Sequence, residues 1–182
     1  MSGGDPAKCE LQASRPRRVW HLPEDVDTDS LAPGAWMHAG IEELAQHCLE
    51  SLCPEFASAV EPGDLIVAGT GFGMGSSREQ AVGALIQLGV GAVIAPRFGG
   101  LFFRNAFNLG LLLLTCDDVS SLRSQTHLCL DPQRFTLTWV DGTPVTVQPI
   151  PDFLQEMIRQ GGLLNTLRTR QALPPNAMEK LS

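Results

Sequence analysis

Short apolar runs alternate with amphipathic stretches along the middle of the chain. Three apolar runs are bounded by turn residues, which is typical of buried strands. They occupy residues 65–68, 90–95 and 111–114. Two stretches with apolar positions at helical spacing, residues 77–88 and 101–109, lie between these runs, and each is followed by a glycine. This order of strand, helix, strand, helix and strand predicts right-handed crossovers and a largely parallel sheet.

The N-terminal third contains less regular patterns. Residues 19–22 are predicted to form a short strand. Residues 41–52 have apolar positions at helical spacing between Gly40 and Pro54, which predicts a helix. Residues 25–30 are acidic and rich in turn formers, so we place them in a loop.

After residue 117 the pattern changes to strict alternation. Residues 135–140 and 143–147 predict a hairpin around Asp141-Gly142, and residues 150–158 predict a closing helix that ends before Gly161. Neither a repeat nor a low-complexity linker divides the chain. We therefore expect a flexible N-terminal tail over residues 1–17, a single α/β domain over 18–168 and a C-terminal tail over 169–182.

Composition and charge narrow the class of protein. The 182 residues are 43% hydrophobic, which is enough for a core. Thirteen basic and 20 acidic residues give a net charge of −7 without a concentrated basic face, so a nucleic-acid partner is not expected. No apolar stretch is long enough to span a membrane, and no secretory signal is visible. These features predict a cytoplasmic protein.

The five cysteines do not suggest a metal centre. They lie at positions 9, 48, 53, 116 and 129. No pair has C-x-x-C spacing, and no histidine lies at metal-ligand spacing from a cysteine. Most are better explained as buried, reduced thiols, and we expect this chain to bind no metal of its own.

The first apolar strand runs into a glycine-rich segment, residues 69–75, which ends at Ser76, Ser77 and Arg78. Backbone N–H groups at a helix N-terminus bind anions, and an arginine can hold a carboxylate through two parallel hydrogen bonds. The segment fits neither a P-loop nor a dinucleotide-binding motif. An alternative is purely structural: Ser76 and Glu79 have the spacing of a capping box, in which the serine would end a tight turn.

The glycine-rich segment and its surroundings resemble a known family. Residues 71–79 read Gly-Phe-Gly-Met-Gly-Ser-Ser-Arg-Glu, and residues 27–33 read Asp-Thr-Asp-Ser-Leu-Ala-Pro. With residues 89–95 and 108–111, they resemble the small subunits of 3-isopropylmalate dehydratase and homoaconitase, the aconitase-family hydro-lyases built from two chains. The sequence departs from the family at Gly71, at Gln80 and over residues 97–100, which suggests a divergent branch.

This resemblance implies a fold, a cofactor and partners. It implies an α/β fold, the swivelling β/β/α domain of the aconitase C-terminal type, with a mixed sheet or barrel-like core and flanking helices. It also implies a separate large subunit that holds a 4Fe–4S cluster, with no cluster bound by this chain. The substrate would be a 2-hydroxy di- or tricarboxylate, which the two chains dehydrate and rehydrate.

The same resemblance implies roles for individual residues. Ser76 would be the base and Asp29 its supporting carboxylate. Ser77, Arg78 and Thr28 would bind substrate, with Arg78 as the carboxylate clamp. The backbone of Gly73 and Gly75 would line the anion loop. The alternative for Asp29 is a turn-stabilising role.

One departure bears on the substrate. Relatives commonly carry Arg-Tyr-Leu-Arg in a loop that senses the substrate's variable arm, whereas residues 34–38 read Gly-Ala-Trp-Met-His. An unpaired buried carboxylate costs several kcal/mol, while each buried methylene gains about 0.8 kcal/mol. Trp36 and Met37 therefore favour an alkyl-substituted malate such as 3-isopropylmalate, although His38 could meet a carboxylate. Alternatively, Trp36 and Met37 are core residues of the loop.

A second hypothesis belongs to another functional class. The chain could be a non-catalytic or stand-alone carboxylate-binding module that keeps the fold without the chemistry. The polar residues Ser76, Ser77, Arg78 and Asp29 argue against this, because a decayed site would be expected to lose them first.

Overall fold

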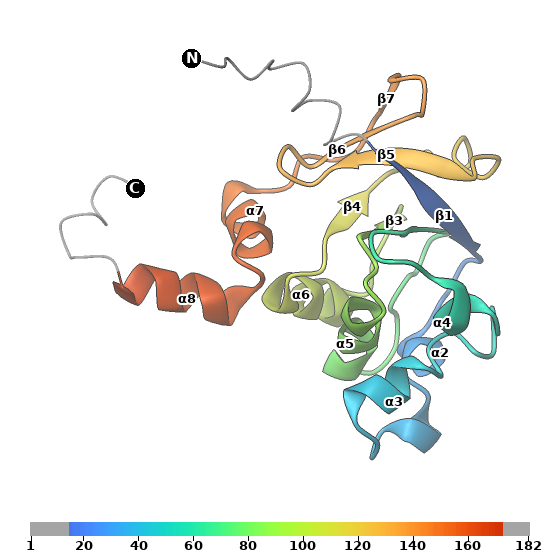
Figure 1. Ribbon diagram of the computed structural model, residues 1–182, viewed down its shortest axis with the longest axis vertical. Helices are drawn as coiled ribbons and strands as arrows, with labels where there is room; N and C mark the ends of the chain where they lie inside the picture. Colours follow the sequence, from blue (N-terminus) through green and yellow to red (C-terminus); the bar gives the residue numbers. More distant parts are fainter. Residues whose placement is uncertain (1–14, 173–182) are drawn as a thin grey trace, which may run out of the picture.

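A computed structural model describes residues 15–172 of the chain (Figure 1). The strands are β1 (Pro16–Leu22), β2 (Leu65–Ala68), β3 (Ala92–Ala95), β4 (Leu113–Thr115), β5 (His127–Asp131), β6 (Thr136–Thr138) and β7 (Pro144–Val145). The helices are α2 (Thr28–Leu31), α3 (Ile41–Ala45), α4 (Phe56–Ala59), α5 (Glu79–Gln87), α6 (Gly100–Leu109), α7 (Asp152–Arg159) and α8 (Leu163–Ala172), with a 3₁₀ turn, η1 (Gly34–Trp36).

All strands belong to one sheet, in the order β4-β3-β2-β1-β5-β6-β7. Strands β1 to β4 are parallel, whereas β5, β6 and β7 pair antiparallel to their neighbours. The predicted succession β2–α5–β3–α6–β4 and its parallel pairing are confirmed. The hairpin is confirmed too, with a shorter β6 and β7 than expected and Gly142 in the left-handed region at its turn.

The two faces of the sheet bury different cores. Alternate residues of β2 point to opposite faces, with Ile66 and Ala68 in one core and Leu65 and Val67 in the other. Helices α2 to α6 cover the first face. The second core lies between the parallel strands and the curled antiparallel strands, which bring Leu128, Leu130 and Leu137 over it (Figure 1). The expected mixed sheet with a barrel-like core and flanking helices is therefore confirmed.

The predicted helix over residues 41–52 is shorter than expected. Helix α3 ends at Ala45, and successive turns follow. Leu49 has a φ of 62°, which interrupts a right-handed helix, and its N–H donates to Ser30 O at 2.8 Å. Cys48 and Leu49 are fully buried. The helical spacing of apolar residues thus reflects burial of a turn rather than of a helix.

The predicted loop over residues 25–30 contains the start of α2. Asp27 caps this helix, because its Oδ1 accepts a hydrogen bond from Ser30 N at 2.7 Å. An aspartate at this position is a helix-start signal that the acidic composition concealed.

The sequence patterns also missed β5, which is defined by pairing with β1, and α8, whose side chains are mostly exposed.

The chain ends differ slightly from the expected domain limits. Strand β1 begins at Pro16, before residue 18, and α8 continues to Ala172, beyond residue 168. The remainder of the two expected tails, residues 1–14 and 173–182, lies outside the described residues.

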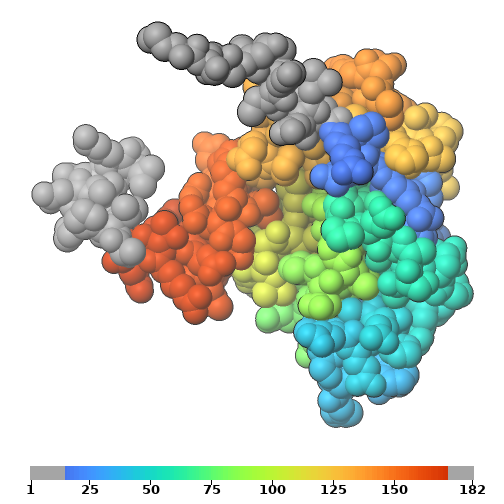
Figure 2. All heavy atoms as spheres, in the orientation of Figure 1, coloured from blue at the N-terminus to red at the C-terminus, as the bar shows by residue number. Residues whose placement is uncertain are grey.

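The predicted closing helix appears as α7, and Gly161 and Gly162 follow it with positive φ angles. In the space-filling view, α7 and α8 form one side of the molecule and residues 30–60 form its lower end (Figure 2).

Candidate active site

The glycine-rich loop connects the carboxyl end of β2 to α5 and is held between two other loops. On one side, Gly73 N donates to Val26 O at 2.7 Å and Thr28 N donates to Met74 O at 2.9 Å. On the other side, Phe72 N donates to Arg97 O at 3.2 Å and its own carbonyl accepts from Gly99 N. Backbone hydrogen bonds to two other chain segments therefore fix the loop before it reaches the serines.

The loop requires glycine at two predicted positions. Gly73 has a φ of 73°, and a Cβ there would overlap the Phe102 ring. Gly75 has a φ of 107°, and a Cβ there would stand 3.2 Å from Thr28 Oγ1. Both positive φ angles are strained for residues with side chains. The backbone thus passes directly over α6 and α2, which leaves Gly75 exposed at the surface.

Ser76 and Ser77 follow as exposed residues. The predicted capping box is wrong: α5 begins at Glu79, its N-cap is Arg78, and no side chain caps it. Within residues 15–172, neither serine hydroxyl has a hydrogen-bond partner, and the N–H groups of Gly75, Ser76 and Ser77 are also unpaired. The serines therefore lie just before the N-terminus of α5 with polar groups that are free to bind, and a helix N-terminus favours negative charge.

The structure brings Arg78 together with Asp29. Arg78 Nη1 lies 2.6 Å from Asp29 Oδ1 and donates to Ala32 O at 2.8 Å. The arginine side chain is 20% exposed and the aspartate 60% exposed. The Arg78 Nε and Nη2 atoms have no partner within residues 15–172, so one edge of the guanidinium is free for a ligand. The carbonyl of Ala32 gave no signal in the sequence.

Thr28 lies beneath the loop. Thr28 is 1% exposed, and its Oγ1 is buried without a hydrogen-bond partner in the described part of the chain. A buried hydroxyl without a partner is uncommon and costs free energy. This hydroxyl lies directly beneath Gly75, and its predicted role in substrate binding stays a prediction.

The segment predicted to sense the variable arm forms η1 and the turn after it. Trp36 and Met37 are half-buried and pack against the main core, while His38 is exposed. Trp36 stacks on His47, with ring centroids 3.7 Å apart and an interplanar angle of 9°. His47 was not singled out from the sequence, because a histidine on an apparent helix carries no signal of this contact.

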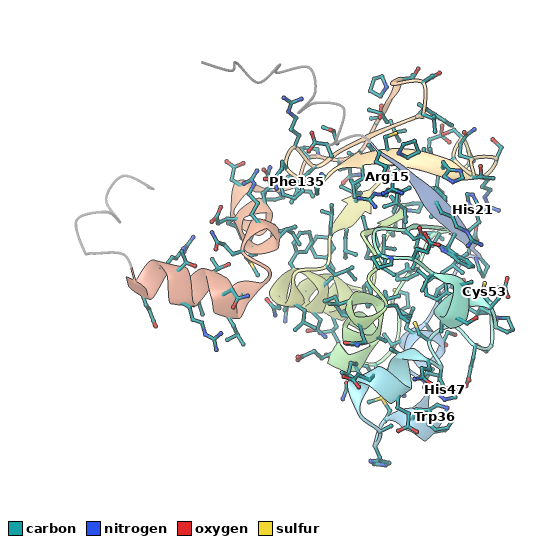
Figure 3. The ribbon with its side chains drawn as sticks, viewed as in Figure 1. Arg15, His21, Trp36, His47, Cys53 and Phe135 are labelled. Atoms are coloured by element: carbon teal, nitrogen blue, oxygen red, sulfur yellow. The ribbon has the colours of Figure 1, made fainter. Side chains whose placement is uncertain are left out.

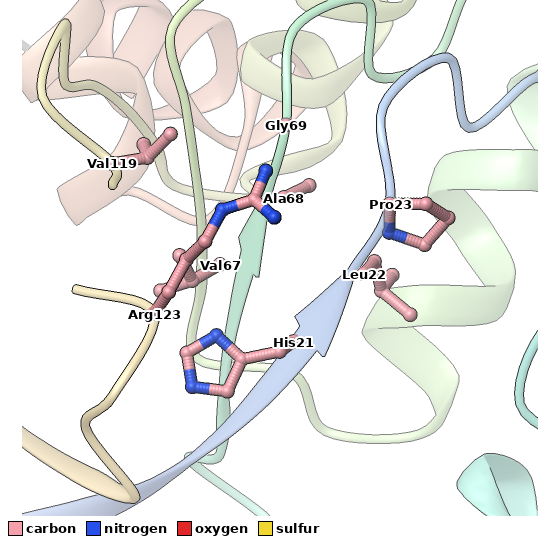
Figure 4. A pocket seen from close by; sticks show the side chains of 8 residues that line it. All are labelled: His21, Leu22, Pro23, Val67, Ala68, Gly69, Val119 and Arg123. Atoms are coloured by element: carbon pink, nitrogen blue, oxygen red, sulfur yellow. The ribbon is translucent and has the colours of Figure 1, made fainter. Parts of the chain in front are cut away.

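Two surface pockets lie near the carboxyl ends of the strands. One, of about 350 Å³, is bounded by Gly73, Gly75 and the start of α6, and reaches Arg104. The other, of about 310 Å³, lies beside the ends of β1 and β2 with His21 and Arg123 at its rim (Figure 4). None of the serine, arginine or aspartate side chains of the predicted site lines this second pocket.

The described residues do not fit a metal cluster. No group of three or more histidine, cysteine or acidic residues in residues 15–172 is arranged to hold a metal ion. Cys48, Cys116 and Cys129 are buried, and burial raises the pKa of the Cys48 thiol to about 12, which disfavours the thiolate that binds iron. Within the same residues, every helix is too short or too polar to span a bilayer.

Four parallel strands of a mixed sheet carry a Gly-Ser-Ser-Arg loop at a strand end, and the family described as "Aconitase C-terminal domain" matches residues 53–119. The chain is 41% identical over 149 residues to 3-isopropylmalate dehydratase small subunit 1 of Archaeoglobus fulgidus, covering 81% of this chain and 92% of that protein. It is 37% identical over 160 residues to small subunit 1 of Thermotoga maritima, covering 86% and 96%.

A crystal structure of 3-isopropylmalate dehydratase from Methanocaldococcus jannaschii superposes with a TM-score of 0.77 at 32% identity, covering 92% of this chain and 98% of that one. This chain belongs to the family of 3-isopropylmalate dehydratase small subunits.

Proposed function

We propose that this chain is the small subunit of a two-chain hydro-lyase that dehydrates and rehydrates 3-isopropylmalate in the cytoplasm. The single observation that carries the proposal is the Ser76–Arg78 loop. Among the described residues, its two serine hydroxyls and three N–H groups have no partner, and they lie beside the Arg78–Asp29 pair. Relatives about 40% identical, which align over 81% of this chain and at least 90% of their own length, are named as small subunits of that enzyme.

Ser76 is the proposed base. Its alkoxide would take the proton from the carbon beside a substrate carboxylate, and the C–H electron pair would become the C=C bond as hydroxide leaves the neighbouring carbon. An ordinary serine hydroxyl is too weak an acid for this role. The unpaired N–H groups of Ser76 and Ser77, the N-terminus of α5 and the Arg78 charge would stabilise the alkoxide. In the reverse direction, Ser76 returns the proton to the same carbon.

Arg78 is the proposed carboxylate clamp. Asp29 and the Ala32 carbonyl both bind Nη1, which turns the opposite edge of the guanidinium, Nε and Nη2, toward a ligand. Two parallel hydrogen bonds from this edge would hold a substrate carboxylate in a fixed orientation. Asp29 acts on the substrate through Arg78, and Ser77 supplies a further hydrogen bond. Thr28 lies buried beneath Gly75 and supports the loop from below.

The cluster-bearing partner is the second part of the proposal. Because the donor set of residues 15–172 does not fit a 4Fe–4S cluster, we assign the cluster to a larger partner chain, as the family resemblance implies. When bound in that chain, the cluster would supply the Lewis acid for the departing hydroxide.

The variable arm is proposed to be alkyl. Trp36 and Met37 offer apolar surface at η1 and the following turn, and His38 is the one basic side chain of residues 34–38. An isopropyl group gains free energy on this surface, whereas a second carboxylate would lose hydration without an arginine or lysine to receive it.

Reconstitution with the large subunit tests the proposal. The pair is assayed side by side on 3-isopropylmalate and homocitrate, and we expect kcat/KM to favour 3-isopropylmalate. A preference for homocitrate would show that the arm assignment is wrong. Absence of hydro-lyase activity on either substrate, with a correctly assembled pair, would favour the non-catalytic binding module instead.

A further inference from the structure

Trp36, in the segment 34–38 that is proposed to receive the substrate's variable arm, stacks on His47. The two rings are nearly parallel, with centroids 3.7 Å apart, and they project side by side from η1 and from the turns after α3 (Figure 3). Trp36 remains partly exposed. His47 therefore covers part of the indole and leaves the rest open to a ligand.

A second contact holds the His47 ring in this plane. Its Nδ1 lies 2.6 Å from Glu50 Oε2. An ionised carboxylate can only accept hydrogen bonds, so Nδ1 carries the hydrogen and donates it. The imidazole is thus held at one edge by Glu50 and against one face by Trp36, which restricts its rotation about both side-chain torsions.

The turn that carries His47 is also hydrogen-bonded to α2, the helix that contains Asp29. Leu49, two residues after His47, is fully buried and donates from its N–H to Ser30 O at 2.8 Å. Ser30 follows Asp29, which binds Arg78. Residues 47–50 therefore contact both α2, which carries the aspartate, and η1, which carries the tryptophan.

We propose that His47 is a positioning residue that fixes the plane of Trp36 and thereby the wall that receives the substrate's alkyl arm. This inference rests on the proposed function, because it assigns Trp36 to that wall. His47 itself does not contact the reacting atoms. Its effect is on discrimination between arms rather than on proton transfer at Ser76.

Kinetics of the reconstituted pair test this role. In His47→Leu, which removes the stack and the Glu50 contact, we expect the KM for 3-isopropylmalate to rise roughly 5-fold while kcat changes less than about twofold. For the shorter-armed analogue 3-methylmalate, the KM should stay close to that of the wild type. His47→Phe, which keeps a flat ring beside the indole, should restore most of the preference for the longer arm.

His127→Leu is the matched control, because His127 is exposed on β5 and makes no aromatic contact within the described residues. Equal losses on both substrates in His47→Leu would overturn the inference, since they would indicate a general structural role. An unchanged KM for 3-isopropylmalate would overturn it too. If the wild-type pair itself does not turn over 3-isopropylmalate, the proposed function fails and this inference fails with it.

A spectroscopic measurement on the full chain alone separates these cases. Stacking on the His47 ring places Trp36 in a distinct environment, so we expect the tryptophan emission to change in His47→Leu and to stay unchanged in His127→Leu. Emission identical to the wild type in His47→Leu would show that the stack does not form. This readout does not depend on activity, and it therefore distinguishes an absent stack from a wrong substrate.

Discussion

The backbone on either side of Ser76 is anchored, whereas its hydroxyl makes no hydrogen bond among the described residues. Gly73 and Met74 are bonded to Val26 and Thr28, and Arg78 begins the helix that follows. The serine therefore has a defined position while its hydroxyl has no partner within residues 15–172. This combination suits a group that must bind and release a proton at each turnover.

Ser76→Ala should abolish turnover of the reconstituted pair. Because the alkoxide acts mainly in the transition state, kcat and kcat/KM should fall together by at least about a thousandfold, with folding unchanged. Steady-state kinetics and a thermal melt measure the two effects. Ser124→Ala, on an exposed turn, is the control, and near-normal rates in Ser76→Ala would remove this serine from the mechanism.

Arg78→Lys should also be severe. A lysine ammonium is a point charge that cannot bind Asp29, the Ala32 carbonyl and a substrate carboxylate in one plane. We expect kcat/KM to fall roughly a hundredfold or more, whereas stability should change by less than about 1 kcal/mol because the Asp29 side chain is 60% exposed. A denaturant titration beside the kinetics measures both, and a stability loss that parallels the activity loss would contradict the clamp assignment.

The cysteines should differ in reactivity. Burial raises the pKa of Cys48 to about 12, so at pH 8 only roughly one thiol in ten thousand is ionised. The folded-state pKa of Cys48 lies above the ordinary value of 9.0, so folding favours the neutral thiol. This contribution to stability is fully present below pH 9.0 and is lost as the pH rises from there through about 12. Alkylation of the native chain at pH 8, followed by peptide mass spectrometry, should label the partly exposed Cys53 before Cys48. Early labelling of Cys48 would contradict the buried position.

At the scale of elements, the site depends on how closely α6 and α2 approach the glycine loop. Phe102 of α6 lies under Gly73, and the Gly99 N–H before this helix binds the Phe72 carbonyl. Helix α2 contacts the loop from the other side through Thr28. The loop is thus the contact point of two helices, and its geometry changes if either contact is forced apart.

Gly73→Ala should displace the loop. The added methyl group overlaps the Phe102 ring, and a φ of 73° is itself strained for alanine, so we expect a loss of about 2–4 kcal/mol in the free energy of unfolding. Chemical denaturation measures it. Gly100→Ala is the matched control at the first residue of α6, where a Cβ meets nothing within 4 Å and should be neutral or slightly stabilising. Equal stability of the two variants would contradict the close approach.

At the scale of the whole molecule, the curled sheet places the glycine-rich loop and residues 34–38 on the same side as the first core. Both are attached to helices α2 to α6, while the antiparallel strands close the opposite side. The site residues lie at the molecular surface, because Ser76, Ser77 and His38 are all exposed. We therefore expect the complete site to form together with the large subunit.

The isolated chain should therefore be colourless and inactive. Its described residues offer no ligand set for a cluster, so the absorption spectrum should show no iron–sulfur band. Mixing with the large subunit should give a complex on size-exclusion chromatography and hydro-lyase activity. An iron–sulfur band from this chain alone would contradict the two-chain assignment.

The sequence by itself determined the parts of the fold that depend on neighbouring residues. The apolar strands β2 to β4 and the helices α5 and α6 appear where the patterns predict them, because each is bounded by turn residues and buries one continuous stripe or run. The position of the glycine loop between β2 and α5 follows from the same order, and family resemblance supplied the roles of its residues.

Only the tertiary structure decided which distant residues meet. The contact of Arg78 with Asp29 and Ala32 joins segments that are more than forty positions apart, and the stack of Trp36 on His47 requires the helical pattern over 41–52 to end early. Leu49 adopts a left-handed conformation because its burial and its bond to Ser30 outweigh the local preference for a helix. Such contacts depend on long-range packing, which a local pattern of residues does not contain.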